Sequence, residues 1–342
     1  MQPTLPKIDT TYGSDLNGMI WGYHFVSGKA PVSVTSEQAL ILLAEKRASE
    51  ASDFLWLHFS LSNSSTVPWL KQNLNLPQAF YDSLRSRVGS TRLELESETL
   101  VAVIHDVQFD FSFDVSSVTT ASLSIDPRLL VSVRLRPLRS VDLLRSAVRS
   151  GQSFRSTGQL LAHLLVDQAG VLIDIVRDTT IRVNEIEDKM LANRVTTSRS
   201  ELGALRRVLV RLQRLLAPEP AALFRLLHRP PEWISEDDIQ NLQQAAEEFS
   251  VAVGDTAALV ERLKLMQEEL VAIVTEQSNR TLFVLTLVTV LALPINLTSG
   301  LFGMNVGGIP FGSSSYGFPT IVTILLLLTG LLAYIFLLKR RN

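Results

Sequence analysis

The chain contains no cysteine among its 342 residues, and no charged residue or histidine between Arg280 and Lys339. The lack of cysteine excludes a disulfide framework, a thiolate zinc site and a thiol nucleophile. The second absence covers 58 residues, so all 66 formal charges lie in the other 284. The N-terminal segment has no apolar core, and we expect no signal peptide there. These absences favour one soluble domain with a small membrane part, and neither a cytosolic enzyme nor a transporter with many spans.

The uncharged region consists of two apolar runs, 281–300 and 319–338, separated by a loop rich in glycine and serine. Each run has 20 residues, which is about 30 Å of helix and enough to cross a bilayer once. Arg280 precedes the first run and three basic residues follow the second, whereas the loop has none. The positive-inside rule therefore predicts a multi-pass protein with both termini in the cytoplasm. A buried helical hairpin in a soluble core is the less favoured alternative.

One face of the first run is more polar than the rest. Stepping alternately by three and four residues from Asn279 reaches Leu282, Thr286, Thr289, Leu293, Asn296 and Gly300. Two helices cannot enclose a pore, so a conducting protein would need a ring of protomers with one such helix from each at the axis. We interpret this face as pore-lining; the alternative is helix–helix hydrogen bonding without a pore. The second run is mainly leucine, isoleucine and valine on all sides and is expected to face lipid.

The soluble part begins as mixed α/β structure and becomes helical. Alternating or apolar runs predict strands at 21–26, 54–60, 91–96, 100–105, 122–125 and 130–135. Helical periodicity is expected at 36–49, 77–87, 141–148, 158–193 and 200–216, before prolines 218, 220, 230 and 231 break the helical run. The predicted regions are an α/β domain at 1–140, a helical region at 141–234, one stalk helix at 235–300 that continues into the first span, a loop at 301–318, and a second span with a basic tail at 319–342.

Charge is segregated along the chain. Residues 127–230 carry 18 basic and 9 acidic groups, whereas residues 232–279 carry 2 basic and 11 acidic groups. This difference predicts that the two regions pack together, and it assigns Arg206, Arg207, Arg211 and Arg214 to the acidic stalk. No aromatic residues lie between these arginines, so we expect no nucleic-acid partner.

The predicted pore face extends back into the acidic stalk. Steps of seven from Leu282 reach Thr275, Glu268, Glu261, Gly254 and Glu247. Repeated around a ring, the three glutamates would form a negative cytoplasmic funnel that concentrates cations. The alternative is a solvated helix face that happens to share this register.

The loop between the spans contains the tripeptide Gly303-Met304-Asn305, directly after the first span. Glycine permits close approach of helices, and asparagine offers an uncharged amide oxygen. A ring of such oxygens can hydrogen-bond the water shell of a divalent cation without removing it.

With this loop motif, the chain resembles the CorA metal-ion transporter family, the two-span GxN group, and within it the ZntB-type zinc-transporter branch. The most specific segment is LTSGLFGMNVGGIP followed by YGF, and the similarity extends to residues 56–70, 216–227 and 233–238. The resemblance implies an α+β cytoplasmic funnel domain, a long stalk helix and two transmembrane helices, assembled as a homopentamer in the bacterial inner membrane.

The resemblance also implies a set of functional residues. Gly303, Met304 and Asn305 would form the selectivity entrance, with Asn305 contacting the metal through its hydrating water. The family's pore-lining positions correspond to Asn279, Leu282, Leu285, Leu293 and Asn296, and Glu268 falls at a position that is often an inward-facing acid. The implied cargo is Zn²⁺, with Mg²⁺, Co²⁺ and Ni²⁺ as other candidates, protons as a second candidate partner and no tightly bound cofactor.

Competing interpretations are a CorA-type Mg²⁺ channel and a non-conducting membrane-anchored scaffold or sensor. The acids usual after the motif in the magnesium branch are missing here, and an anchor needs neither the polar seam nor the motif. No catalytic triad, phosphate loop or dinucleotide fingerprint supports an enzyme.

The sequence also contains candidate metal ligands in the soluble part. The five histidines show no ligand spacing, and we expect His58 and His105, which lie in strand-like runs, to be core or sheet-face residues. Asp106, Asp110 and Asp114 are candidates for a regulatory divalent-cation site.

Overall fold

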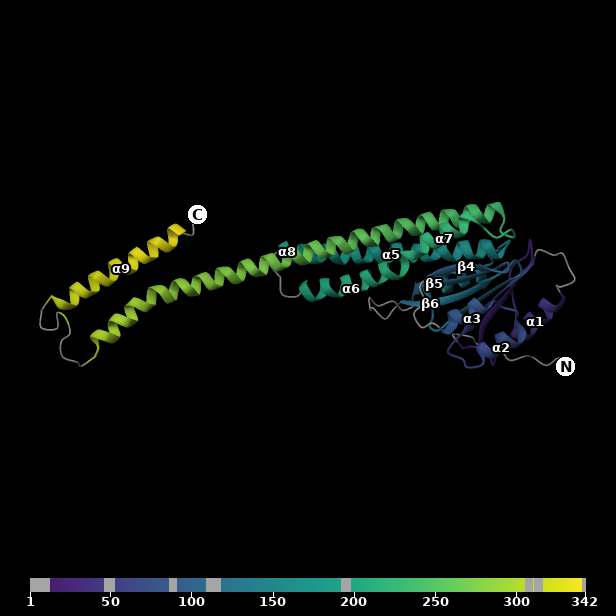
Figure 1. Cartoon of the computed structure of the whole chain (residues 1–342), viewed down its shortest axis with the longest axis horizontal. Helices are drawn as coiled ribbons and strands as arrows, with labels where there is room; N and C mark the ends of the chain where they lie inside the picture. The colour runs from purple at the N-terminus through teal and green to yellow at the C-terminus, as the bar shows by residue number, and fades with distance from the viewer. Residues whose placement is uncertain are drawn as a thin grey trace. The chain divides into compact units, whose positions relative to one another are not determined.

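The computed structural model describes residues 13–45, 53–85, 91–108, 118–191, 198–304, 310 and 316–339. These residues belong to two compact units, Met1–Gln267 and Glu268–Asn342. The helices α1–α7 and all seven strands lie in the first unit, α8 crosses the boundary, and α9 lies in the second (Figure 1).

The first unit is built on one seven-stranded sheet in the order β2-β1-β3-β7-β6-β5-β4. The strands are β1 Met19–Phe25, β2 Val32–Ser33, β3 Phe54–Ser60, β4 Arg92–Glu96, β5 Thr99–Val107, β6 Val118–Ile125 and β7 Leu129–Arg134. The central pair β3·β7 is parallel, and the other pairs are antiparallel.

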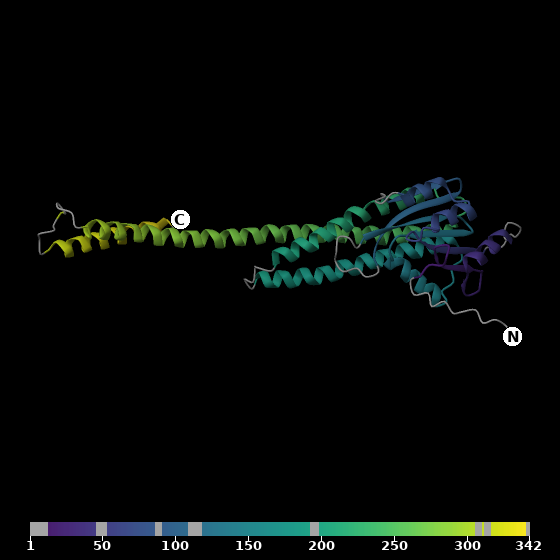
Figure 2. The same ribbon diagram turned by 90° about the horizontal axis from the view of Figure 1, so that it is seen from below.

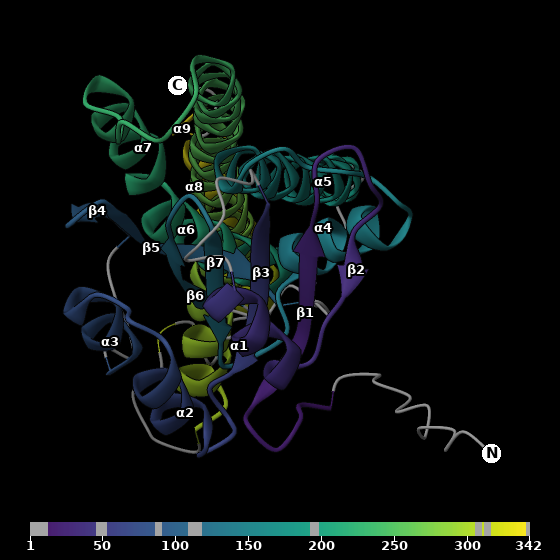
Figure 3. The same cartoon turned by 90° about the vertical axis from the view of Figure 1, so that its right-hand side faces the viewer.

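Helices cover both faces of the sheet, as the view along the long axis shows (Figure 3). Strand β3 shows why its sequence is apolar without alternation: Leu55, Leu57 and Phe59 enter the core beneath α1–α3, whereas Phe54 and Trp56 enter the core on the other face. The bounds of the first three helices are α1 Ser36–Glu45, α2 Thr66–Asn73 and α3 Gln78–Arg85.

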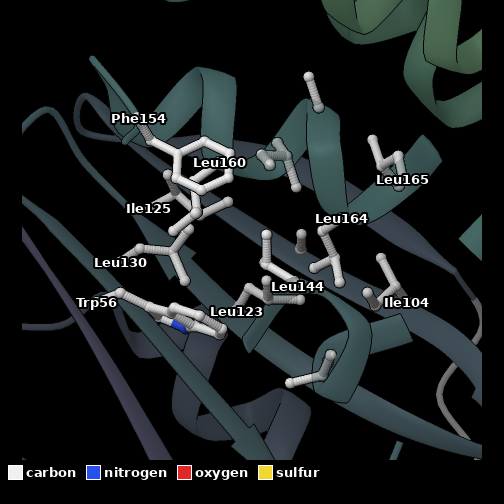
Figure 4. Close-up of a cluster of buried hydrophobic side chains, with 14 of the residues drawn as sticks. Trp56, Ile104, Leu123, Ile125, Leu130, Leu144, Phe154, Leu160, Leu164 and Leu165 are labelled. Atoms are coloured by element: carbon white, nitrogen blue, oxygen red, sulfur yellow. The ribbon is translucent and has the colours of Figure 1, made fainter. Parts of the chain in front are cut away.

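The second core lies between the sheet and the helices that follow it. Side chains of β5–β7 meet Leu144 of α4 and Phe154, Leu160, Leu164 and Leu165 before and within α5 (Figure 4). These helices are α4 Arg139–Arg149, α5 Thr157–Leu191, α6 Ser198–Leu216 and α7 Pro218–His228.

Two proline-containing helices differ from the sequence prediction. The expected break after residue 216 is only a short interruption, because α7 begins at Pro218. Similarly, α2 was not predicted, and Pro68 is its third residue. A proline in the first helical turn removes an N–H that has no intrahelical partner, so it starts a helix as readily as it ends one.

The longest element is α8, Glu236–Phe302, with 67 residues and Pro294 inside it. Its first part has a buried seam with alternating steps of three and four residues, namely Leu242, Ala245, Phe249, Ala252, Thr256, Leu259, Leu263, Met266 and Leu270. Every residue of α8 after Leu270 is at least partly exposed.

The second unit contains the rest of α8 and α9, Gly317–Lys339. Its two helices lie side by side, and the rings of Phe283 and Phe336 are 6.1 Å apart between centroids (Figure 2). Phe283 lies near the start of the first apolar run and Phe336 near the end of the second, so the two runs are antiparallel.

Three helices among the described residues are long and apolar enough to cross a membrane: α5, α8 and α9. Their environments differ. In α5 the most apolar window is 56% buried within the protein, whereas the corresponding windows of α8 and α9 are 0% buried. The apolar character of α5 is thus explained by the sheet it covers, and that of α8 and α9 is not explained by contacts within the chain.

Candidate cation pathway

Within the second unit, α8 has two distinct faces, one toward α9 and one away from it. The face toward α9 is partly buried and comprises Phe283, Leu287, Val290, Pro294 and Thr298. The matching partly buried positions of α9 are Ile321, Leu325, Thr329, Leu332 and Phe336, spaced by three or four residues. One face of each helix therefore packs on the other, and the remaining apolar surface is open.

The residues predicted to line a pore lie on the other side of α8. Leu282, Leu285 and Leu293 are 57%, 62% and 64% exposed. The polar members of the seam and its glycine are exposed too: Asn279, Thr286, Thr289, Asn296 and Gly300. Steps of three and four residues keep these side chains on one strip of the helix, which α9 leaves uncovered.

The threonine hydroxyls of this strip are already engaged as donors. Thr286 Oγ1 donates to the Leu282 carbonyl at 2.8 Å, and Thr289 Oγ1 donates to the Leu285 carbonyl at 2.9 Å. The lone pairs of each hydroxyl oxygen remain able to accept. Because water bound to a cation presents its hydrogens outward, an uncharged row of acceptors suits a hydrated cation.

The glutamates of the predicted funnel share the same face. Glu247 and Glu261 lie in the first unit and Glu268 in the second, and all three are exposed, as is Gly254 between them. Each is displaced by about half a turn of the helix from the buried seam. Glu261 is paired with Lys264 at 3.1 Å, so its negative charge is partly neutralised within α8.

These acids do not form a metal site within one chain. In the described part of the chain, no group of three or more histidine, aspartate or glutamate side chains could hold a metal ion. Glu261 and Glu268 are seven residues apart, which is about 10 Å along the helix axis, and Glu247 is twice as far from Glu261, so one ion cannot be shared between them.

The structure describes the first two residues of the loop motif. Gly303 follows the end of α8, and its N–H donates to the Ser299 carbonyl at 3.0 Å. A Cβ at this position would lie 2.9 Å from the same carbonyl oxygen, so the close turn requires glycine. Met304 is 52% exposed. Asn305 lies outside the described residues.

The first aspartate of the candidate regulatory site has a structural role instead. Asp106 is buried, and its carboxylate accepts from Ser140 N at 2.9 Å, Ser140 Oγ at 2.6 Å and Val107 N at 2.7 Å. Burial raises the pKa of Asp106 to about 6. The carboxylate thereby holds the start of α4 against β5. Asp110 and Asp114 lie outside the described residues.

The expected histidine environment is confirmed. His58 is fully buried, stacks on Trp21 at 4.1 Å between ring centroids, and accepts from Arg134 Nε at 2.8 Å. Desolvation by burial, followed by Arg134 and Arg145, lowers the pKa of His58 well below its ordinary value. His105 is 2% exposed and also belongs to the interior.

The predicted pairing of the four arginines with the acidic stalk is wrong for the described residues. None of Arg206, Arg207, Arg211 and Arg214 forms an ion pair with an acid of α8 there; Arg206 donates to the Gln267 amide at 2.9 Å. The ion pair between the two regions has the opposite sense, because Arg262 of α8 contacts Glu187 of α5 at 2.5 Å. Charge counts cannot determine which side chains face each other.

The sequence did not predict one buried acid of the first unit. Glu219, at the start of α7, accepts from His105 N at 2.6 Å and from Gln168 Nε2 at 2.7 Å. Desolvation raises the pKa of Glu219 to about 8, with the nearby Asp106 acting in the same direction. The network joins α7 to β5 and α5, and its only local signal is a glutamate between two prolines.

Comparisons with known proteins show which family and which transporters this chain resembles. The family model described as CorA-like Mg2+ transporter protein matches residues 51–340. The zinc transport protein ZntB of Pectobacterium atrosepticum is 25% identical over 321 residues, covering 93% of this chain and 94% of that protein. The divalent cation transporter CmaX of Pseudomonas aeruginosa is 28% identical over 310 residues, covering 89% and 91%.

Solved structures agree in fold. The structure of full-length CmaX has a TM-score of 0.79 at 22% identity and covers 95% of this chain and 99% of its own. The CorA magnesium transporter of Methanocaldococcus jannaschii has a TM-score of 0.71 at 18% identity and covers 94% and 97%. Both matches extend across the soluble sheet and the C-terminal helices.

Proposed function

Because the chain belongs to the CorA-like Mg2+ transporter family, and is thus a divalent-cation transporter of the CorA/ZntB type, we propose that it carries Zn²⁺ across the bacterial inner membrane as a homopentamer. The ion passes largely hydrated along a five-fold axis lined by α8. Regions 1–140 and 141–234 lie in the cytoplasm, residues 235–300 form the stalk and first span, residues 301–318 the outer loop, and residues 319–342 the second span and cytoplasmic tail.

The observation that carries the proposal is the polar strip of α8. A single chain covers one face of its first span with α9 and leaves Thr286, Thr289 and Asn296 exposed on the other, within a run that carries no charge. Uncovered polar side chains at bilayer depth are costly, and they are found facing partners or water-filled spaces. A ring of copies with a wet axis provides both.

Two glycines of α8 support the same arrangement, one on this strip and one between the glutamates of the predicted funnel. Gly254 and Gly300 are exposed, and a Cβ built on either would have no atom within 4 Å. Glycine in a helix interior costs about 1 kcal/mol relative to alanine. Among the described residues no atom fills the space beside either glycine, whereas close approach of a second copy would use it.

The steps of conduction follow from the side chains along the strip. Asn305 of each copy would hold the hydrated ion at the outer mouth, with Gly303 and Met304 shaping the entrance. The ion would then pass Asn296, Thr289 and Thr286, whose oxygens accept from its water, and the leucines between them. Glu268, Glu261 and Glu247 would attract it toward the cytoplasm.

Zinc as the cargo is supported by the ZntB relatives and by the loop. Residues 306–318 carry no acid, whereas the magnesium branch usually has acids after its motif. The competing function is an Mg²⁺ channel, which the description of the family model favours. No aspartate, glutamate, histidine, lysine or arginine lies within either apolar run, so coupling to protons through such groups would have to use acids of the stalk or the soluble domain.

The test is uptake into proteoliposomes, with Zn²⁺ compared with Mg²⁺, each with and without a pH gradient. Zinc uptake should exceed magnesium uptake and should be lost in Asn305→Ala. Magnesium uptake that exceeds zinc uptake would instead favour a CorA-type Mg²⁺ channel. Failure of a correctly inserted protein to transport either ion would favour the scaffold or sensor.

A matched pair of substitutions tests the polar strip itself. Thr289→Val removes a hydroxyl from the exposed strip, and Thr298→Val removes the same group from the face toward α9. Both hydroxyls donate to the carbonyl four residues earlier, so the local helical change is equal. We expect Thr289→Val to lower zinc uptake several-fold and Thr298→Val to leave it near wild type. Equal effects would contradict the pore assignment.

A further inference from the structure

A cavity of about 500 Å³ opens in the first unit. Its walls come from α3, from strands β5, β6 and β7, and from the C-terminal half of α6. The volume lies in the range of small-molecule sites, and it greatly exceeds the space needed for one inorganic ion.

The charge around this cavity is positive and is not balanced by the residues that line it. Arg85, Arg211 and Arg214 line the cavity, and no carboxylate is among its described lining residues. Arg211 and Arg214 make no ion pair within the described part of the chain, and Arg211 Nε is buried there without a hydrogen-bond partner. Arg85 has one weak contact, 4.0 Å from Asp82, with both side chains more than half exposed.

Arg214 is exposed and Arg211 is half-buried, so the buried donor without a partner is Arg211 Nε. Such a buried N–H is unfavourable unless an acceptor reaches it. The guanidinium group presents donors in a fork that matches two oxygens of a phosphate. Two such groups, three residues apart on one helix face, can approach one phosphate from the same side.

The remaining walls offer a second kind of surface. Thr119 and Thr120 of β6 are partly exposed and contribute hydroxyl groups, while Leu84, Val133 and Leu215 contribute an apolar floor. A ligand that satisfies all of these groups has a phosphate at one end and a body with hydroxyl and apolar surfaces at the other.

We propose that this cavity binds a small phosphate ester of about mononucleotide size, with Arg211, Arg214 and Arg85 on its phosphate oxygens. A nucleic-acid strand is disfavoured because no phenylalanine, tyrosine or tryptophan is among the residues that the structure describes around the cavity. None of the described lining residues belongs to α8, so the proposal does not depend on the cation pathway.

The test uses the purified full-length protein without divalent cations, so that no metal–nucleotide complex forms. Binding of ADP, AMP, adenosine and inorganic phosphate is measured by calorimetry, together with the melting temperature followed by tryptophan fluorescence. Sodium chloride at matched ionic strength controls for screening. ADP and AMP should bind and raise the melting temperature, and adenosine should do neither.

Substitution of the arginines that line the cavity tests whether the ligand binds there. Arg211→Ala with Arg214→Ala should weaken ADP binding about tenfold or more, because at least one charge-assisted hydrogen bond is lost. Arg225→Ala, an exposed arginine of α7 outside the cavity, removes the same charge and should bind like wild type. If the alanine variant unfolds, Arg211→Lys with Arg214→Lys keeps the charge, and it should still weaken binding through loss of the fork.

Three outcomes would overturn the proposal. They are no binding of ADP or AMP to the wild-type protein, unchanged binding in folded Arg211/Arg214 variants, and an affinity for inorganic phosphate as high as that for ADP. None of these measurements involves transport, so a failure here would leave the cation proposal untouched.

Discussion

The two parts of α8 differ in what covers their apolar side chains. Up to Leu270, a seam of fully buried side chains gives the helix a core made by its own chain. Beyond Leu270, the helix is more apolar but has only partial cover from α9, and its most apolar window is 0% buried. An apolar helix surface is stable only when something removes it from water. The first part therefore owes its stability to intramolecular packing, and the second requires cover from outside the chain, which the proposed function assigns to lipid and to other copies.

The largest expected effect separates these two sources of stability. Phe249 is fully buried in the first part, and Phe249→Ala should reduce the free energy of unfolding of the first unit by about 3–5 kcal/mol. Leu285, in the second part, is 62% exposed, and Leu285→Ala should change it by less than about 0.5 kcal/mol. Urea unfolding of the purified protein, followed by tryptophan fluorescence, measures both. Similar losses would show that the two parts share one core.

The second effect is the dependence of stability on pH. Among the described residues, the buried acids with strongly raised pKa values lie in the first unit. The folded-state pKa of Glu219 is raised to about 8 from an ordinary value of 4.5, so the folded protein holds a proton that the unfolded chain releases. This contribution to stability is fully present below about pH 4.5 and is lost as the pH rises towards 8, with a slope of at most about 1.4 kcal/mol per unit.

Glu219→Gln tests this expectation. The amide has nearly the shape of the protonated acid but cannot titrate, so melting temperatures measured between pH 5 and 8 should fall less steeply in the variant than in the wild type. Asp106, with a pKa raised from 3.8 to about 6, contributes a loss of stability of the same sign over a narrower pH range, and it does so in both proteins. Parallel pH profiles would show that Glu219 is ionised in the folded state.

The smallest effect lies at the ion pair that joins α8 to α5. Arg262 and Glu187 are 2.5 Å apart, but their side chains are 41% and 47% exposed. Solvent screening therefore limits their coupling to about 0.2–1 kcal/mol, and this is expected from a double-mutant cycle with Arg262→Ala and Glu187→Ala. Increasing the salt concentration should reduce the coupling further. A much larger value would make the contact of α8 with α5 electrostatic rather than apolar.

The elements most visible in the sequence are those whose signal is local. The apolar runs, the long helix, the six longer strands and the family all follow from composition, periodicity and the loop motif, and the family assignment is confirmed. The helices α2 and α7 were missed because proline was interpreted as a helix breaker, although it lies in the first turn of each. The two-residue strand β2 is too short for periodicity to show.

The side-chain partners were less predictable. The arginines of α6 were matched to the acids of α8 by net charge, but packing turns Arg211 and Arg214 toward a cavity and places Arg262 beside Glu187. Asp106 looked like a metal ligand in a run of spaced acids, whereas the fold uses it to hold the start of α4. Each of these outcomes depends on which residue of one element faces which residue of another.

The sequence by itself determined that this protein has a soluble α/β part, a long helix and two membrane-competent segments, and it identified the polar strip, because these properties depend on the order of residues along one chain. The tertiary structure decided what that order leaves open. It distinguished α5, whose apolar surface covers the sheet, from α8 and α9, whose apolar surfaces remain uncovered. It also buried Glu219 and gathered three arginines around one cavity, because burial and charge pairing arise only when distant segments meet.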